Sequence, residues 1–188
     1  STAQPTQSPE TVGPIKGIVY LDPNYTAKTV YLSEIPPYVV RAGPNDEVLI
    51  HHAPDDTIYQ VGEDGKLDVY ASFLNFSIEE FGFDRQGNLW FSINGNKLYE
   101  VKNDSPVMIA QNVNRRFAFD SLGNVYAVDF PSHGIQMITP GGHVTVLASD
   151  VVTSWIDVGP NDEIVAMSNG RLVQVQPNGQ WRVVADGL

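Results

Sequence analysis

The sequence predicts an all-β protein built from repeated four-stranded antiparallel units. Tight-turn signals containing Gly or Asn-Asp recur about every 40 residues, at Asp46, Gly87, Gly123 and Asp162. Runs rich in aromatic and β-branched residues separate these turns, and such residues suit the half-buried surface of a strand. No stretch shows convincing helical periodicity. Four strands in a repeat of this length are typical of one blade, so we expect a β-propeller.

Each unit follows the same order of strands and turns. In the second unit the first strand is an alternating run at Phe81–Phe83, and the second strand is Asn88–Ser92 after a tight turn. A looser loop leads to a third strand at Lys97–Val101. Another turn, such as Asn178-Gly179, opens the fourth strand and needs residues that tolerate positive φ. We place four blades at residues 36–74, 75–113, 114–151 and 152–188.

The segment before the first blade matches the second half of the last one. Residues 16–35 read as a strand, a Pro-Asn turn and a second strand, which predicts a half-blade and a propeller domain over residues 15–188. Residues 1–14 are polar and rich in Ser, Thr, Gln and Pro. We interpret them as a disordered leader left after signal-peptide removal, or as a linker.

The half-blade raises the question of ring closure, because a closed propeller leaves no long sheet edge exposed. Six blades of about 40 residues need roughly 240 residues. The chain has 188, so we expect about four and a half blades of a longer, six-bladed ring. Two alternatives stay open: a compact ring with one incomplete blade, and self-association of two copies through that blade.

Charge and composition narrow the classes of partner. The formal net charge of −11 repels phosphate backbones and anionic lipids, so we expect no nucleic-acid binding. No apolar run has the length of a membrane helix, so we expect no membrane insertion. The absence of cysteine excludes disulfides, thiolate metal ligands and cysteine nucleophiles. Small molecules, cations and basic proteins stay open, and a leader of this kind favours a secreted or periplasmic protein.

Two segments resemble known families. Val125–Leu147, VYAVDFPSHGIQMITPGGHVTVL, resembles the NHL repeat in its aspartate, its IQ strand and its PGG turn. Phe83–Val101, FDRQGNLWFSINGNKLYEV, is similar to blades of streptogramin lyase and of the gluconolactonase (senescence-marker lactonase) superfamily. The resemblance covers Lys16–Leu188 and implies the propeller fold. It implies no single activity, because these families include lactonases, lyases, other hydrolases and interaction modules.

The loops that open on the channel face of such a propeller collect polar side chains, which is typical of a ligand site. The ligand-binding candidates on that face are Glu79, Glu80, Arg115, Arg116, Trp155, His52 and His133. Arg115 and Arg116 would clamp a carboxylate or a phosphate. The alternative is that they form ion pairs with Glu79 and Glu80 of the neighbouring blade.

The aromatic candidates also have structural alternatives. Trp155 would stack on a ligand, or it belongs to the core. His51 and His52 are adjacent in a strand, so their side chains are expected on opposite faces, one inward and one at the surface. His133 lies in a loop from which it would reach the channel face.

The lactonase resemblance implies a divalent cation held by Glu, Asn and Asp side chains from different blades. Glu80, Asn94 and Asp129 would approximate this set, and their oxygens suit Ca²⁺ or Mg²⁺. Asp129 is also the candidate catalytic base, with an acidic residue of a further blade as the alternative. Ile93 is apolar where a further ligand would help. The alternative is that these are solvated loop charges, with Asp129 bonded to its own loop backbone.

Two functions are therefore expected. The first is an extracytoplasmic module that binds a small molecule or a protein on its channel face. The alternative is a metal-dependent lactonase or hydrolase that is complete only with further blades. A scaffold that joins larger assemblies is a third class.

Overall fold

The structure is a computed structural model that describes residues 17–21, 27–32, 39–62, 64–94 and 96–187. These residues form four four-stranded antiparallel sheets, one two-stranded sheet and one 3-10 turn. The predicted all-β fold of four-stranded antiparallel units is therefore confirmed. No helix in the described part of the chain is long and apolar enough to cross a membrane. The leader or linker expected at residues 1–14 lies outside the described residues.

The strands follow one another in chain order across each sheet. The first sheet comprises β3 (Val39–Ala42), β4 (Val48–His52), β5 (Thr57–Val61) and β6 (Leu67–Ser72), with the 3-10 turn η1 (Ala53–Asp55) after β4. The second comprises β7 (Ile78–Phe83), β8 (Leu89–Ile93), β9 (Lys97–Lys102) and β10 (Ser105–Gln111). The third comprises β11 (Val113–Phe119), β12 (Val125–Asp129), β13 (Ile135–Ile138) and β14 (Val144–Ala148). The fourth comprises β15 (Ile156–Val158), β16 (Ile164–Ser168), β17 (Arg171–Val175) and β18 (Trp181–Asp186).

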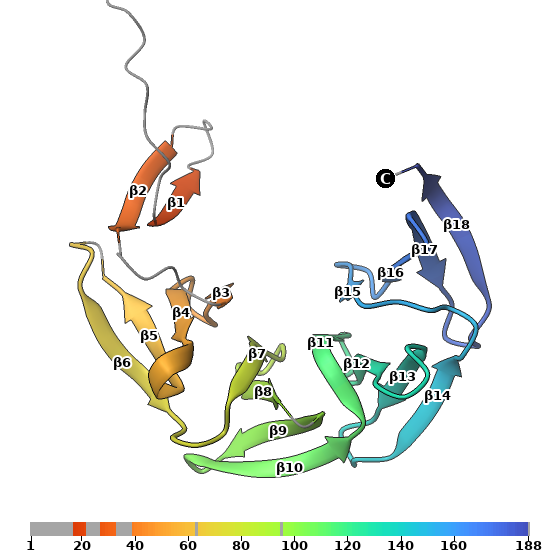
Figure 1. Ribbon diagram of the computed structural model, residues 1–188, viewed down its shortest axis with the longest axis horizontal. Helices are drawn as coiled ribbons and strands as arrows, with labels where there is room; N and C mark the ends of the chain where they lie inside the picture. Colours follow the sequence, from red (N-terminus) through yellow and green to blue (C-terminus); the bar gives the residue numbers. More distant parts are fainter. Residues whose placement is uncertain (1–16, 22–26, 33–38, 63, 95, 188) are drawn as a thin grey trace, which may run out of the picture.

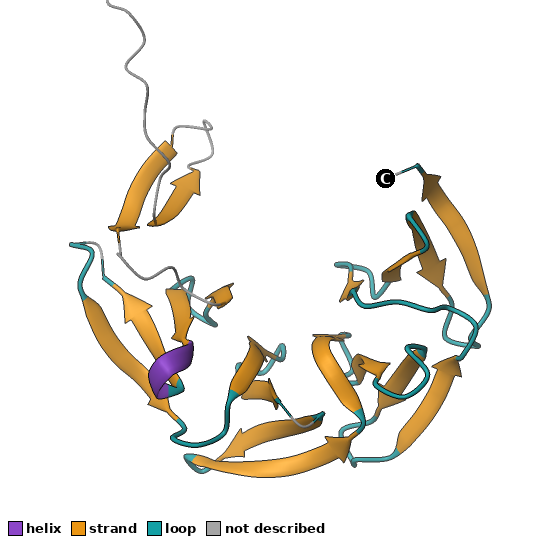
Figure 2. Cartoon of the chain, viewed as in Figure 1, coloured by secondary structure: helices purple, strands orange, loops and turns teal. Residues whose placement is uncertain are grey.

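The four sheets stand side by side along an arc, as blades do around a propeller channel (Figure 1). The first strand of each sheet lies on the inner side of the arc and the fourth strand on the outer side (Figure 2). Within the half-blade expected at residues 16–35, the structure describes an antiparallel pair of β1 (Gly17–Leu21) and β2 (Ala27–Leu32). The six-bladed ring stays a prediction.

Hydrophobic side chains fill the space between neighbouring sheets. Between the first and second sheets, Leu49 and Ile58 pack against Phe81 and Phe91, and all four side chains are fully buried. Phe91 also stacks on Tyr99, with the ring centroids 5.3 Å apart. Two similar clusters join the second sheet to the third and the third to the fourth. Because such cores are close-packed, they fix how the inner strands face the channel.

In the second and third sheets, an aspartate closes the turn between the first two strands. The Asp120 carboxylate accepts the backbone N–H groups of Leu122 and Asn124 at 2.9 and 2.8 Å. It also accepts the hydroxyl of Tyr126 at 3.0 Å. Asp84 makes the equivalent contacts in the second sheet. Each turn is therefore held by one side chain that satisfies several donors.

In the first and fourth sheets, a glutamate takes that place. Glu47 accepts the backbone N–H of Asn45 at 2.8 Å, and Glu163 makes the same contact in the fourth sheet. All four turns contain a residue with positive φ, and these residues are Asp46, Gly87, Gly123 and Asp162. They are the same residues that mark the repeat in the sequence, because a tight turn requires this backbone conformation.

Candidate functional site

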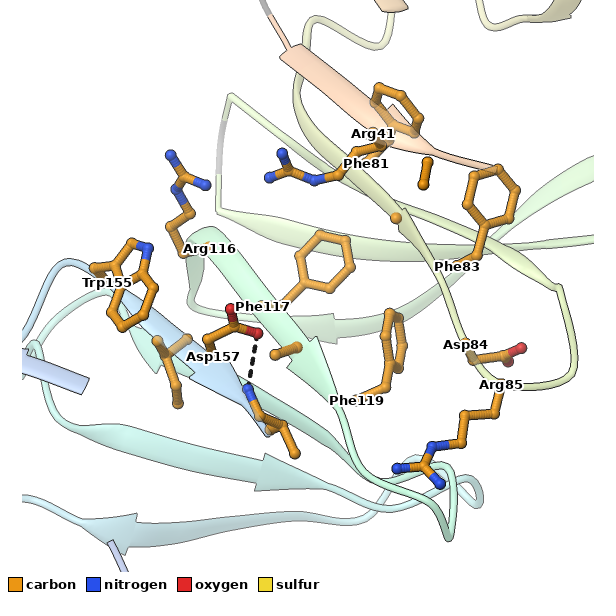
Figure 3. A pocket seen from close by; sticks show the side chains of 15 residues that line it. Arg41, Phe81, Phe83, Asp84, Arg85, Arg116, Phe117, Phe119, Trp155 and Asp157 are labelled. Carbon is orange, nitrogen blue, oxygen red and sulfur yellow. Dashed lines mark hydrogen bonds between the residues drawn. The ribbon is translucent and has the colours of Figure 1, made fainter. Parts of the chain in front are cut away.

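A cavity of about 540 Å³ lies along the inner strands β3, β7, β11 and β15 (Figure 3). Its aromatic lining residues are Phe81, Phe83, Phe117, Phe119 and Trp155. Its charged lining residues are Arg41, Asp84, Arg85, Arg116 and Asp157. In Figure 3, Arg41 and Arg116 lie on the same side as Trp155, whereas Asp84 and Arg85 lie at the opposite end. Aromatic walls with a few charged groups are the usual lining of a ligand pocket.

The buried carboxylate of Glu80 joins two of these arginines. Its Oε1 lies 2.6 Å from Nη2 of Arg41, and its Oε2 lies 3.1 Å from Nη1 of Arg116. Arg41, Glu80 and Arg116 come from the first, second and third sheets, so the carboxylate links three blades. Glu80 is 3% exposed, whereas the side chains of Arg41 and Arg116 are 35% and 40% exposed. The two guanidinium groups therefore cover the carboxylate and also reach the cavity.

An irregularity in β7 places Glu80 in this position. The pairing with β8 shifts between Ile78 and Glu80, so that Ile78 lies opposite Ile93 and Glu80 lies opposite Ser92. Such a bulge leaves one extra residue, here Glu79, and re-aims the side chains beside it. Glu80 is buried and contacts Arg116 of β11, whereas Glu79 is partly exposed and contacts the adjacent Arg115.

Burial raises the pKa of Glu80 above its ordinary value, and the charges of Arg41 and Arg116 oppose that rise. The backbone N–H of Phe81 also donates to the carboxylate at 3.2 Å. With Glu80 ionised, Arg41, Glu80 and Arg116 together carry one more positive than negative charge. Asp84 and Asp157 also line the cavity, and the chain has a formal net charge of −11. The charge excess is therefore local to the two guanidinium groups, and it is there that an anion is favoured.

Arg41 is the member of this cluster that sequence reasoning missed. Counted back from the turn of each sheet, Glu80, Arg116 and Trp155 occupy equivalent positions. Arg41 lies two residues further along its own strand, where the second sheet has Gly82. Gly82 itself faces the rings of Phe117 and Phe119 in the third sheet. The corresponding residues of the third and fourth sheets are Ala118 and Asp157, so the alignment of the repeats has no consistent polar position that would have indicated Arg41.

The ion pairs that were the alternative to an arginine clamp are present. Arg115 Nη2 lies 3.3 Å from Glu79 Oε1, and Arg116 pairs with Glu80. The Arg115 side chain is half exposed and does not line the cavity. Exposed pairs of this kind contribute about 0–1 kcal/mol to stability. Arg116 and Trp155 are the predicted ligand-binding residues that line the cavity.

The two histidine candidates lie away from the cavity lining. His52 Nδ1 lies 3.1 Å from a carboxylate oxygen of Asp55, in η1. The His133 ring lies 6.5 Å from the ring of Phe130, and its backbone has a φ of +56°. His51 is fully buried and His52 is partly exposed, as expected for adjacent side chains of one strand.

The predicted metal ligands make other contacts. Asp129 accepts the backbone N–H and the hydroxyl of Ser132, in its own loop, as the structural alternative expected. Both oxygens of Glu80 contact arginines. For Asn94 the contact is made by the backbone, whose N–H donates to the carbonyl of Ser77. Within the described ranges, no group of three or more His, Asp or Glu side chains is placed to hold a metal. A Ca²⁺ or Mg²⁺ site, and a catalytic role for Asp129, stay predictions that this arrangement does not favour.

No family model matches the sequence, and no curated protein matches it. Solved structures do match the fold. Virginiamycin B lyase from Staphylococcus aureus, solved with quinupristin, has a TM-score of 0.67 at 15% identity, over 92% of this chain and 64% of the lyase. A gluconolactonase from Xanthomonas campestris has a TM-score of 0.71 at 14% identity, over 92% of this chain and 69% of that chain.

The extracellular domain of a protein described as a hybrid two-component system, from B. thetaiotaomicron, has a TM-score of 0.63 at 14% identity, over 87% of this chain and 27% of that chain. The chain spans 63% and 64% of the length of the two virginiamycin B lyase structures that it matches. At such identities the shared property is the fold. The expected likeness to streptogramin lyase and gluconolactonase is confirmed at this level, and the chain is a β-propeller similar in fold to both.

Proposed function

We propose that the protein is an extracytoplasmic binding module that takes a small organic anion into the channel cavity. The observation that carries this proposal is the cluster of Arg41, Glu80 and Arg116, in which two partly exposed guanidinium groups share one buried carboxylate. The cluster has one positive charge in excess at the cavity wall. An anionic group on a ligand would balance that charge in surroundings that are poorer in water than the open surface.

Arginine suits this task, because its planar guanidinium has five N–H donors. In Arg41, Nη2 contacts Glu80 and Nη1 donates to the backbone carbonyl of Val40 at 2.8 Å. In Arg116, Nη1 contacts Glu80. Each group thus has more donors than these contacts use. A carboxylate or phosphate of the ligand would accept from both and form charge-assisted hydrogen bonds.

The aromatic residues of the cavity lining indicate the chemistry of the rest of the ligand. Trp155 occupies the position in the fourth sheet that Arg116 occupies in the third, and Phe117 follows Arg116 in β11. Both rings line the cavity. A ligand with an apolar body beside its anionic group would place that body on these rings, where burial of apolar surface adds to affinity.

An extracytoplasmic location is part of the proposal. It is supported by the likeness in fold to the extracellular domain of a protein from B. thetaiotaomicron.

Benzoate tests the anion site, with benzyl alcohol as its neutral counterpart, by isothermal titration calorimetry. We expect benzoate to bind more tightly than benzyl alcohol. We expect Arg116→Gln to weaken benzoate binding about tenfold through the loss of one charge-assisted contact. Arg115→Gln is the matched control, because Arg115 pairs with Glu79 outside the cavity lining. Equal binding of the two compounds, or equal losses in the two variants, would contradict the proposal.

A metal-dependent lactonase or hydrolase is the second candidate. It is favoured by the fold shared with gluconolactonases and by a buried carboxylate of raised pKa beside the cavity. Titration with CaCl₂ and MgCl₂ separates the two functions. Metal binding that is lost in Glu80→Gln and in Asp129→Asn would favour the hydrolase. Glu80→Gln has the opposite consequence for the anion site, where it removes an internal competitor for the arginines.

A further inference from the structure

A second cavity, shallow and widely open to solvent, lies on the outer side of the arc, between the third and fourth sheets. Its volume is about 540 Å³, and it is lined by residues 147–150 and 178–181. The first stretch contains the end of β14, and the second contains the turn that opens β18, which lies beside β14 in Figure 1. It shares no residue with the channel cavity.

The indole of Trp181 forms one wall of this outer cavity. Trp181 is 40% exposed, although tryptophan usually buries most of its large surface. Its Nε1 donates to Oδ2 of Asp150 at 2.9 Å. Trp181 belongs to the fourth sheet and Asp150 follows the third, so this hydrogen bond spans the boundary between two blades. The polar edge of the ring is thereby held in place while part of its surface faces water.

The opposite wall is fixed by a close approach of two backbones. Gly179 has a φ of +83°, and a Cβ at this position would lie 2.1 Å from the carbonyl oxygen of Leu147. Only glycine satisfies both conditions. The turn therefore packs directly against β14, next to the strand that carries Trp181. A preformed site of this kind lowers the entropic cost of binding.

Amide side chains line the rim of the cavity. Asn178 Oδ1 accepts the backbone N–H of Gln180 at 3.0 Å, and Asn178 Nδ2 donates to Oε1 of Gln180 at 3.3 Å. Each primary amide has two N–H donors and a carbonyl acceptor, so both keep capacity for a ligand beyond this contact. Ser149 adds a hydroxyl and Asp150 adds a carboxylate oxygen to the same lining.

The chemistry of this set selects the ligand class. Lysine and arginine are absent from the lining residues, which disfavours an anion. Amides, a hydroxyl and a carboxylate pair with hydroxyl groups, and an exposed indole accepts the apolar C–H face of a sugar ring. We propose that the outer cavity binds a neutral saccharide, with Trp181 as its stacking surface and Asp150 as the residue that orients the indole. This proposal goes beyond the channel site and does not depend on it.

Cellotetraose, maltotetraose and tetra-N-acetylchitotetraose are the probes. Their binding is monitored in ¹H–¹⁵N spectra through the indole N–H signals of the tryptophans in the whole chain. The chain has three tryptophans, and the Trp181 signal is assigned by its loss in Trp181→Phe. We expect at least one probe to shift the Trp181 signal and to leave that of Trp155 in place. If none of the probes shifts the Trp181 signal at about 10 mM, the proposal is overturned, because weaker binding would not be specific. This readout needs only the folded wild-type protein.

Variants then test the assigned roles. Trp181→Ala should weaken the saccharide at least about tenfold, the scale of a lost aromatic anchor. Phe130→Ala is the matched control, because Phe130 is an exposed aromatic residue outside the cavity lining. Asp150→Asn keeps an acceptor for the indole N–H and removes the charge, so saccharide binding should stay within about threefold. A tenfold loss of saccharide binding in that variant would show that the carboxylate itself holds the sugar, against the orienting role assigned to Asp150. Binding of benzylamine in place of a saccharide would mark a cation site, and either result would overturn the proposal as stated.

Discussion

Glu80 and Asp162 each connect three neighbouring blades, at opposite ends of the inner strands and in opposite environments. Glu80 is buried near the start of β7 and contacts Arg41 and Arg116. Asp162 is partly exposed in the turn after β15. It accepts the backbone N–H of Ser121 at 2.7 Å as well as the Ser121 hydroxyl. It also lies 3.2 Å from Arg85 of the second sheet.

The two pKa shifts show what each carboxylate does for the fold. Burial raises the pKa of Glu80, whereas the hydrogen bonds from Ser121 lower the pKa of Asp162. The hydrogen bonds donated to Asp162 replace the hydration that its ionised carboxylate loses. This carboxylate therefore connects neighbouring turns without depending on a buried partner charge. The buried carboxylate depends on two partner charges. Perturbed groups of the second kind are characteristic of functional sites.

The largest effect is expected when both partners of Glu80 are removed. In the double variant Arg41→Met and Arg116→Met, a buried carboxylate loses both guanidinium groups. We expect the free energy of unfolding in urea to fall by about 3–5 kcal/mol at pH 7. The loss should shrink at pH 4, where Glu80 is protonated. Arg115→Met is the control, and its exposed pair should cost at most about 1 kcal/mol. If Arg115→Met lowered the free energy of unfolding by a similar amount, the buried ion pairs of Glu80 would not differ in strength from an exposed ion pair.

A smaller effect is expected on ligand affinity. Glu80→Gln keeps the shape of the side chain and removes the carboxylate that shares the two arginines. Benzoate affinity should rise about three- to tenfold, because the guanidinium groups no longer interact with an internal anion. Calorimetry on Glu80→Gln beside wild type measures this change. Unchanged affinity would show that the cluster is structural and that the anion site lies elsewhere.

The smallest effect is expected in the pH dependence of stability, where the two carboxylates act in opposite directions. The pKa of Glu80 lies above its ordinary 4.5 in the folded state, so its contribution to stability declines as the pH rises from 4.5 through the raised value. The pKa of Asp162 lies below its ordinary 3.8, so its contribution is present above 3.8 and is lost as the pH falls below it.

Thermal unfolding midpoints across pH 2–7 separate these two slopes. Asp162→Asn should flatten the acid side of the profile, and Glu80→Gln should flatten the decline above about 4.5. The Asp162 change should be the slighter one, because its carboxylate is exposed and screened by water. A profile that Asp162→Asn leaves unaltered would mean that Ser121 and Arg85 do not hold this carboxylate in solution.

The strand order and the turns were predictable from sequence, because they depend on local chemistry. Gly87 and Gly123 mark turns that need positive φ, and alternation in the flanking runs marks strands. The channel cluster was only partly predictable. Arg116 and Trp155 follow from aligning the repeats, but Arg41 does not, because it reaches Glu80 from another position of its strand.

The histidine candidates show a second limit of sequence reasoning. His52 is followed by a 3-10 turn, and His133 has a left-handed backbone. Both features belong to loops between the second and third strands, whose paths depend on contacts with the next blade. Asp56, for example, accepts the backbone N–H groups of Ser77 and Ile78 of the second sheet. A repeat alignment carries no information on such contacts.

The meander order of every sheet has a consequence for how the chain reaches its native state. Each strand pairs with its sequence neighbour, so the hydrogen-bonded contacts within a blade close only short loops. Short loops form quickly, and any blade is therefore able to act as the starting point from which structure spreads to the next. The hydrophobic clusters between sheets are then the couplings that make this spread cooperative. Kinetic intermediates, where they occur, should consist of whole adjacent blades rather than of strands taken from several.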